Sequence, residues 1–188
     1  MASIHGYCCA TKTPLPETFF LRGADCWGWA TWSRAWKVFN PDGAFLLGEL
    51  KRRRLTKLFD FDSTFECMSM LADQVAGKND SWAIRWSASA FLANMLTLYP
   101  ARSLVQNIGY DFSGEHCGGS RIWDVQLSVT PIHIERIPIK DSIIGRKAFE
   151  AFFRQNLPRP SRLKTIATDH VRPALSRIAR QLGLRNGS

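Results

Sequence analysis

The segment 25–36, which reads D-C-W-G-W-A-T-W-S-R-A-W, constrains the fold more than any other, because it places four tryptophans within ten residues. An indole ring is so large that it must either be buried or present its flat face to a ligand, and four of them exceed what a small core needs. Gly28 between Trp27 and Trp29 would let a ligand approach the backbone, and flat rings suit sugar faces or nucleobases. The segment predicts a ligand-binding surface, with a tryptophan-lined corner of the core as the alternative.

Composition sets the class of protein but not its partner. The chain has 188 residues, of which 45% are hydrophobic and 22% charged, and these values predict a folded domain and exclude a disordered chain. Lys and Arg number 25 against 16 Asp and Glu, which gives a formal charge of +9. Charge alone admits nucleic acid, an anionic membrane surface or a phosphorylated substrate as a partner.

The cysteines and the apolar windows exclude several classes of protein. The five cysteines are odd in number and form neither a C-x-x-C pair nor a zinc-ligand spacing, so we expect reduced core thiols in a cytosolic protein. The most apolar window, Trp82–Tyr99, contains Arg85 and Asn94 and is too short to cross a bilayer. The first ten residues lack the pattern of a signal peptide.

Hydrophobic periodicity predicts an α/β fold in which helix outweighs strand. We expect helices over residues 31–38, 43–58, 64–76, 81–96, 142–155 and 161–182, and short strands over residues 1–10, 98–100, 103–108 and 125–134. Ser63 and Glu66 have the spacing of a capping box for the third helix, and Gly77 is placed to end it.

A change in composition near residue 157 predicts one boundary. Residues 1–157 form the expected globular part, and residues 158–188 carry seven cations against the single anion Asp169. Apolar residues at helical spacing make this tail a basic amphipathic helix, which suits peripheral contact with an anionic membrane. The alternative is a helix packed on the domain with a solvated basic face.

Two further segments hold side chains suited to chemistry. Asp80 precedes the helix over 81–96, where a carboxylate can accept a proton from a bound hydroxyl, and Arg85 could orient that acid or contact a phosphate. The alternative is that Asp80 or Ser81 only caps the helix. The loop 107–117 combines Asp, Glu and His with glycines, which suits a divalent cation or a diphosphate, although solvated loop side chains are the alternative. The D-x-D string at 60–62 favours a plain connector between helices.

Taken in this order, the segments resemble the C-terminal part of family-two glycosyltransferases of the GT-A fold, over roughly residues 3–120. The resemblance rests on I-H-G-Y at 4–7, W-G-W-A-T-W at 27–32, Asp80 with Trp82 and Arg85, N-I-G at 107–109 and G-E-H at 114–116. The tryptophan string is the most specific of these matches.

The resemblance implies transfer of a sugar from a nucleotide-sugar donor to the hydroxyl of a glycan acceptor, with inversion. By position, Asp80 would be the catalytic base, and His116 would contact a divalent cation (Mg or Mn) or the diphosphate. The expected substrate-binding residues are Asp25, Trp27, Gly28, Trp29, Trp32, Trp82 and Arg85. Such chemistry needs a base on the acceptor side and a positive charge on the leaving-group side, where it neutralises the diphosphate.

One departure from the family limits the expectation. In these enzymes the nucleotide-binding half, with its D-x-D motif, precedes the strand at which this chain begins. We therefore expect an acceptor-side half with an incomplete GT-A-type mixed sheet, inactive without an upstream polypeptide half. The alternative is a non-catalytic basic binding module for nucleic acid or an anionic membrane, and the absence of a nucleic-acid motif makes nucleic acid the weaker partner. The expected location is the cytoplasm, including the inner face of the membrane.

Overall fold

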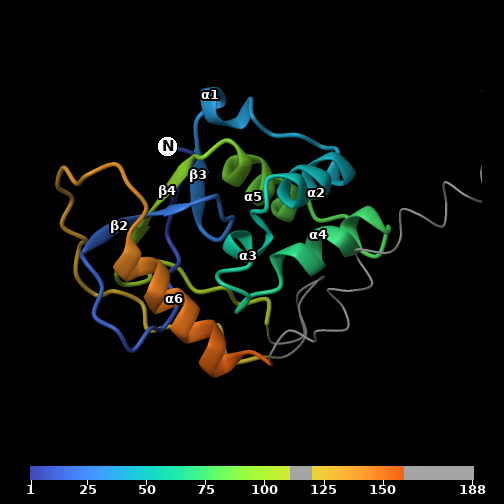
Figure 1. Cartoon of the computed structure of the whole chain (residues 1–188). Coiled ribbons are helices and arrows are strands. Elements are labelled where there is room, and N and C mark those ends of the chain that lie inside the picture. The colour runs from blue at the N-terminus through green and yellow to red at the C-terminus, as the bar shows by residue number, and fades with distance from the viewer. Residues whose placement is uncertain (111–119, 159–188) are drawn as a thin grey trace, which may run out of the picture.

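Four short strands form one mixed sheet in the computed structural model, which describes residues 1–110 and 120–158 (Figure 1). The strands are β1 (Ser3–His5), β2 (Thr18–Arg22), β3 (Trp29–Thr31) and β4 (Leu96–Pro100). Their spatial order is β2-β4-β1-β3, and β1 runs parallel to β4, while the two outer pairs are antiparallel. The outer side of β2 is partly covered, because Ser142 N–H donates to the carbonyl oxygen of Phe20.

Helices outweigh strands, as predicted, and the fold is α/β. They are α1 (Ser33–Trp36), α2 (Gly43–Arg52), α3 (Thr56–Phe59), α4 (Cys67–Val75), α5 (Trp82–Leu92) and α6 (Ile143–Asn156). Figure 1 shows α2, α4 and α5 gathered on the right and the strands on the left, with α6 across the front. Helix α6 packs against β2, and α2 packs against both α4 and α5.

Three helices end in the same way, and this shortens two of the predicted ones. Arg54, Gly77 and Asn94 adopt positive φ angles of 56°, 73° and 54° directly after the ends of α2, α4 and α5. The amide of the following residue then reaches back five residues, as in the bond from Leu55 N–H to the carbonyl of Leu50. This Schellman geometry closes the helix. The helix predicted over 43–58 is therefore broken into α2 and α3, and the one over 81–96 ends early, whereas Gly77 ends α4 as predicted.

The predicted capping box at Ser63 and Glu66 is wrong. Phe61, Asp62 and Ser63 all have positive φ, so the chain cannot be helical there, and α4 begins only at Cys67. The cap comes instead from Asp60, whose carboxylate accepts from the N–H of Met68 at 2.7 Å. The D-x-D string lies between α3 and α4, which confirms that it is a connector.

The strands predicted over 103–108 and 125–134 do not form, and the first strand covers only Ser3–His5. Isolated backbone bonds, such as that from Leu104 N–H to the carbonyl of Gly6, occur in these segments, and side chains satisfy other backbone groups. Ser103 Oγ accepts from the N–H of Cys8 at 3.2 Å and donates to the carbonyl of Val105 at 2.7 Å. A backbone whose hydrogen bonds are satisfied by side chains gains nothing from pairing as a strand.

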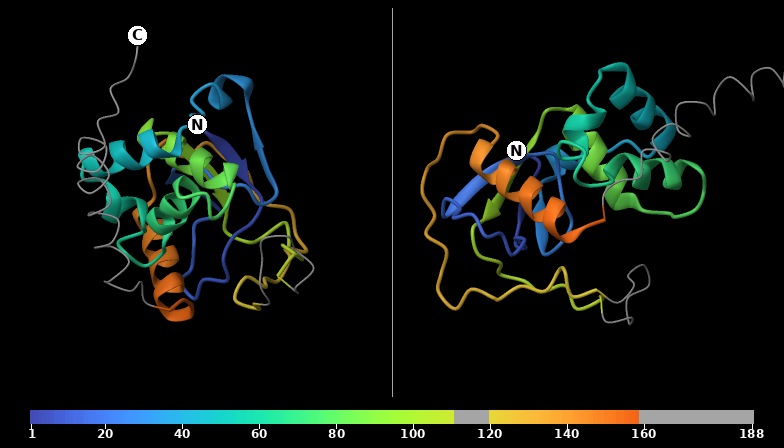
Figure 2. Two further views of the ribbon diagram at one scale, coloured as in Figure 1. Left: turned by 90° about the vertical axis from the view of Figure 1, so that its right-hand side faces the viewer. Right: turned by 60° about the horizontal axis from the view of Figure 1, so that its bottom comes forward.

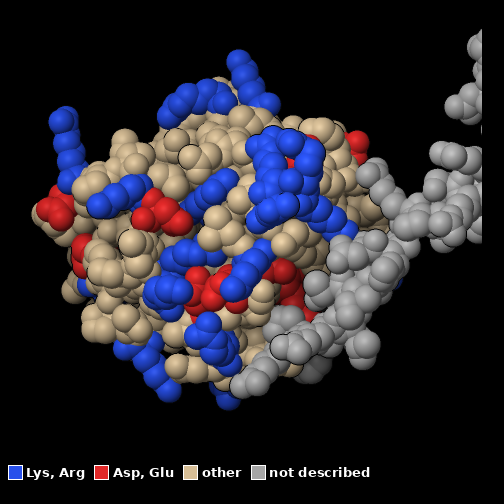
Figure 3. Space-filling view, viewed as in Figure 1, with Lys and Arg blue, Asp and Glu red and all other residues tan. Residues whose placement is uncertain are grey.

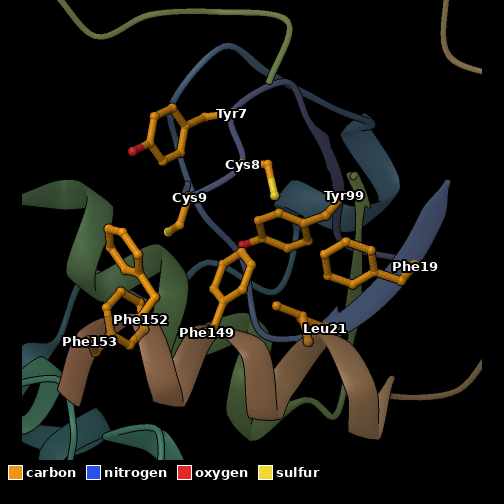
Figure 4. Packing of buried hydrophobic residues seen from close by; sticks show 9 residues of the cluster. All are labelled: Tyr7, Cys8, Cys9, Phe19, Leu21, Tyr99, Phe149, Phe152 and Phe153. Carbon is orange, nitrogen blue, oxygen red and sulfur yellow. The ribbon is translucent and has the colours of Figure 1, made fainter. Parts of the chain in front are cut away.

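The largest buried cluster lies between the N-terminal segment and α6. Phe149, Phe152 and Phe153 of α6 point towards Tyr7, Cys8, Cys9 and Tyr99 (Figure 4). We call this group, with the half-buried Trp27 and Trp123 packed against it, the α6 cluster. The four cysteines among the described residues are free, as predicted, and burial raises the pKa of the Cys8 thiol to about 12.

Several predictions fall on residues outside the described ranges. These are the tail over 158–188 beyond its first residue, with its helix over 161–182, and His116 in the 107–117 loop. The predicted boundary near 157 coincides with the end of α6 at Asn156. Within the described part of the chain, no helix has the length and apolar character needed to span a membrane.

Candidate functional site

The two tryptophans on either side of Gly28 enter different clusters. Trp27 lies in the α6 cluster, with its ring centroid 4.8 Å from that of Tyr7 and 5.6 Å from that of Trp123. Trp29 is at the start of β3, and its ring centroid lies 5.6 Å from that of Trp82 of α5. The two tryptophans of the W-G-W string therefore do not share one surface, because each belongs to a separate aromatic cluster.

Gly28 is required by the conformation and the packing of the chain itself. It has φ of +57°, and its carbonyl accepts from the N–H of Gly6 at 2.8 Å. A Cβ at this position would lie 2.6 Å from Cγ1 of Val105. Because both the backbone angle and the space exclude a side chain, the glycine lets Val105 pack on the turn that separates the two tryptophans.

Aromatic side chains from β3, α1 and α5 form a partly open cluster, which we call the tryptophan surface. Its members are Trp29, Trp36, Phe39, Trp82 and Trp86. Trp86 is fully buried at its base, and Trp36 lies over it at 5.0 Å and is stacked on Phe39 at 4.8 Å. Trp82 and Trp36 remain 43% and 39% exposed. Exposed indole faces held by other rings can stack on a flat apolar ligand face, such as that of a sugar.

Asp80 lies at the same end of α5 as Trp82 and is exposed. The residue that caps the helix is Ser81, whose hydroxyl accepts from the N–H of Ile84 at 3.3 Å. Of the two predicted caps, Ser81 is therefore the one that forms. Asp80 directly precedes this cap, at the positive end of the helix, where a negative charge is stabilised.

Arg85 fixes the backbone around Asp80. Its guanidinium donates to the carbonyls of Asp80 at 3.2 Å, Ser81 at 3.2 Å and Pro41 at 3.1 Å. These three bonds join the start of α5 to the segment that precedes α2. All three acceptors are backbone carbonyl oxygens, so Arg85 holds the main chain on which Asp80 stands.

Asp25 belongs to the surroundings of the α6 cluster. Its carboxylate accepts from the N–H of Cys26 at 2.7 Å and lies 3.7 Å from Nε2 of His5. Burial, with a smaller contribution from this carboxylate, raises the pKa of Tyr99 well above its usual value. Asp25 therefore lies with Trp27, apart from the tryptophan surface.

His5 is a structural residue that sequence reasoning missed. It is 1% exposed, its Nδ1–H donates to the carbonyl of Tyr7 at 2.9 Å, and its Nε2 accepts from the N–H of Trp27 at 2.9 Å. One ring nitrogen must donate and the other must accept, so these bonds define a neutral imidazole. Its position in the I-H-G-Y string, one residue before the glycine that pairs with Gly28, is the signal that could have found it.

The predicted substrate-binding residues thus divide into groups. Trp29, Trp82 and Arg85 lie with Asp80 around the start of α5, while Trp27 and Asp25 lie with the α6 cluster. Trp32, the residue before α1, packs under the Arg34 guanidinium at 4.8 Å. His116 lies outside the described residues, and across residues 1–110 and 120–158 no group of three His, Cys, Asp or Glu side chains could hold a metal ion.

A hollow of about 350 Å³ lies elsewhere, between residues 8–11, 101–103 and 125–130. The guanidinium of Arg102 borders it but is already paired with the carboxylate of Glu17. None of the predicted site residues lines this hollow.

No protein-family profile matches the chain, and no curated protein or solved structure is significantly similar to it. The functional argument therefore rests on the residues and their arrangement.

Proposed function

We propose that this chain is the acceptor-binding and base-bearing part of an inverting glycosyltransferase of the family-two, GT-A type. One arrangement carries the proposal. An exposed carboxylate, Asp80, stands at the start of α5 on a backbone held by Arg85, two residues from the exposed indole of Trp82. A base beside an aromatic platform is what transfer to a sugar hydroxyl requires.

The reaction follows from the residues at the start of α5. The acceptor sugar stacks on Trp82, which Trp29 supports from β3. Asp80 accepts the proton of the acceptor hydroxyl as its oxygen attacks the anomeric carbon of the donor. The bond between that carbon and the nucleoside diphosphate breaks, and the diphosphate leaves from the opposite side, so the configuration inverts. Arg85 acts as a positioning residue for Asp80.

The donor side is assigned to a nucleotide-binding unit outside the described residues. The described residues contain no cluster of metal ligands, so no step is assigned to a divalent cation here. Strand β3 is an edge of the sheet, and Ala30 at its centre is exposed. An open edge can accept a further strand, and pairing at β3 would place a nucleotide-binding unit beside Trp29. This open edge supports the GT-A interpretation.

A glycan array probed with the full chain tests the acceptor site. We expect selective binding to a group of saccharides, and a three- to tenfold loss in Trp82→Ala, the size of a stacking contact worth about 0.5–1.5 kcal/mol. Phe45→Ala is the matched control, because Phe45 is 53% exposed on α2 and outside the tryptophan surface. Absence of saccharide binding, or equal losses in both variants, would contradict the proposal.

Transfer itself is tested by co-expressing the chain with the polypeptide encoded immediately upstream. Release of nucleoside diphosphate is followed with a saccharide that binds the array. Asp80→Asn should retain saccharide binding and lower the rate by about 10²- to 10⁴-fold, the usual contribution of a general base. Asp73→Asn removes another half-exposed carboxylate, 42% exposed near the end of α4, and should leave the rate unchanged. An unchanged rate in Asp80→Asn would remove the base from this site.

A further inference from the structure

One polar group at the base of the tryptophan surface has no hydrogen-bond partner among the described residues. It is the indole N–H of Trp86, whose side chain is 0% exposed. In the same part of the chain this holds for one other buried side-chain atom, Oε1 of Gln74, which lies against Gly43 of α2. A buried donor without an acceptor is costly, so its presence beside exposed aromatic rings needs a physical reason.

The surroundings of Trp86 are apolar. Fully buried alanines belong to the same cluster, and these are Ala2, Ala35 and Ala90. The ring centroids of Trp36 and Trp29 lie 5.0 Å and 6.2 Å from that of Trp86. Methyl groups accept no hydrogen bond, and an indole face accepts one only weakly. An oxygen atom brought to this N–H by a ligand would therefore complete a hydrogen bond that these side chains do not supply.

Trp36 is the exposed ring over Trp86, and its position suits a movable cover. It is 39% exposed and belongs to α1, a helix of four residues. Helix α1 stands at the top of the molecule, clear of α6 (Figure 1 and the left view of Figure 2). The ring of Trp82, on which the acceptor sugar is proposed to stack, lies 6.2 Å from that of Trp36. A substituent of that sugar would reach Trp86 by displacing the ring of Trp36.

We propose that the sugar bound at the tryptophan surface carries an N-acetyl group, and that its carbonyl oxygen accepts from the N–H of Trp86. This inference rests on the proposed function, which places a sugar on Trp82. Trp82 and Trp86 are one helical turn apart on α5, a rise of about 5.4 Å that a sugar with its substituent spans. An amide carbonyl accepts without having to donate, and the methyl group next to it packs among alanines and indoles.

Other sugar substituents fit this environment less well. A hydroxyl group accepts but also donates, and its hydrogen would meet methyl groups and indole faces. A carboxylate has acceptors only, and Lys and Arg side chains lie around the top of the molecule, where α1 stands (Figure 3). Arg34 and Lys37 are exposed there, however, so they would hold a carboxylate at the surface. A carboxylate at Trp86 would be a buried charge among apolar side chains.

Matched saccharides on an array probed with the full chain test the proposal. One set presents glucose, N-acetylglucosamine, glucosamine and glucuronic acid, and a second set presents the corresponding galactose series. In at least one set the N-acetyl sugar should bind at least about fivefold more tightly than the other three, the effect of one net hydrogen bond. Equal binding within both sets, or preference for another member, overturns this inference and leaves the proposed function in place. Absence of saccharide binding overturns both.

Trp86→Phe identifies the donor, because it removes the N–H and keeps an aromatic ring. The preference for the N-acetyl sugar over its hydroxyl counterpart should fall to about onefold, while binding of the hydroxyl sugar stays within about twofold. Trp82→Ala is the matched control. It removes the stacking platform that both sugars share, so both should bind more weakly with their ratio preserved. A ratio that survives Trp86→Phe overturns the role of this N–H.

Proton–nitrogen NMR spectra of the unmodified chain give a readout that does not depend on the stability of a variant. Each of the seven tryptophans contributes one indole N–H signal. A saturating concentration of the N-acetyl sugar should move the Trp86 signal downfield, as formation of a hydrogen bond does, and its hydroxyl counterpart should leave the signal in place. The signals of Trp27 and Trp123, in the α6 cluster, should not move with either sugar. A Trp86 signal that the N-acetyl sugar leaves unchanged overturns the proposal.

Discussion

Trp27 and Trp29 are two residues apart in the sequence and belong to two aromatic clusters that differ in how far they are buried. Trp27 enters the α6 cluster, which the N-terminal segment, β4 and α6 close from several directions. Trp29 enters the tryptophan surface, in which Trp36 and Trp82 stay exposed. The same residue type is therefore enclosed by the fold in one cluster and remains accessible in the other. The buried centre of the α6 cluster consists largely of aromatic rings, whereas the buried residues packed with Trp29 are mostly alanines.

The carboxylates beside the two clusters also differ in how far they are buried. Glu150 of α6 is 2% exposed and is paired with Arg146 at 3.1 Å and Lys147 at 2.7 Å. Buried carboxylates need such partners, because an unpaired buried charge costs several kcal/mol. Asp80, at the start of α5 beside the tryptophan surface, is exposed. A carboxylate that must exchange protons with a ligand has to remain accessible, whereas one that secures a core does not.

We expect the largest loss of stability when an aromatic ring is removed from the α6 cluster. Phe149 is 4% exposed and contacts Phe19, Tyr99 and Phe153. Phe149→Ala should lower the free energy of unfolding by about 3–5 kcal/mol, since it leaves a cavity in a closed core. Chemical denaturation measures the loss. Ile143→Ala on the same helix, where the side chain is 78% exposed, should cost less than about 0.5 kcal/mol. Comparable losses in both variants would contradict the assignment of the α6 cluster as the core.

A second prediction concerns the pH dependence of stability, which we expect to arise beside the buried clusters and not at the exposed surface. Burial raises the pKa of Asp60 from 3.8 to about 7, although the N–H of Met68 partly offsets the effect. The folded state then binds a proton that the unfolded chain releases. The contribution of Asp60 to stability is therefore fully present below pH 3.8 and is lost as pH rises to about 7, by at most about 1.4 kcal/mol per pH unit.

Asp60→Asn isolates this effect, because the amide oxygen can still accept from Met68. Chemical denaturation at a series of pH values should show the variant more stable than the unmodified chain by about 2–4 kcal/mol above pH 7, with the difference vanishing near pH 4. Asp62→Asn is the matched control. Its bond with Lys57 lowers the pKa of Asp62, so the sign is reversed and stability is lost as pH falls. An Asp60→Asn variant that follows the unmodified chain at every pH would show that Asp60 is not buried as a charge.

Sequence reasoning found the elements where local chemistry decides them. Helix spacing located α2, α4, α5 and α6, and Gly77 marked the end of α4 because a glycine tolerates the left-handed conformation. Arg54 and Asn94 adopt the same conformation, but their residue types do not require it, so two predicted helices ran too long. The capping box failed because Asp60, seven residues before α4, supplies the cap through space.

The sequence predicted which residues belong to the candidate site, but not which of the two aromatic clusters each of them joins. The tryptophan string and Asp80 with Trp82 were read directly from the sequence, and the structure places Trp29 and Trp82 in contact. The turn at Gly28 between Trp27 and Trp29 packs against Val105, a contact between residues far apart in the chain. The role of His5 depends on the carbonyl of Tyr7, two residues away, and on the N–H of Trp27, which only the folded chain brings to its ring. Such long-range contacts leave no local pattern in one sequence.

The third prediction acts on the turn that keeps the two clusters apart. In Gly28→Ala, residue 28 must keep φ near +57°, and its new Cβ would lie 2.6 Å from Cγ1 of Val105. Either the turn or Val105 must therefore move. We expect a loss of about 1–3 kcal/mol in the free energy of unfolding, the usual cost of a strained backbone position. Chemical denaturation gives the loss, and the glycan array shows whether saccharide binding at the tryptophan surface changes with it.

A double-mutant cycle with Val105→Ala separates the two causes of this loss. Gly77→Ala supplies the cost of the backbone angle alone, because Gly77 has φ of +73° and its added Cβ would meet nothing within 4 Å. If Val105 pins the turn, Gly28→Ala costs more than Gly77→Ala, and Val105→Ala removes the excess. Equal costs at both glycines would mean that the backbone angle alone directs Trp27 and Trp29 apart. The separation of the α6 cluster from the tryptophan surface would then be a local property of the W-G-W string and not a consequence of the contact with Val105.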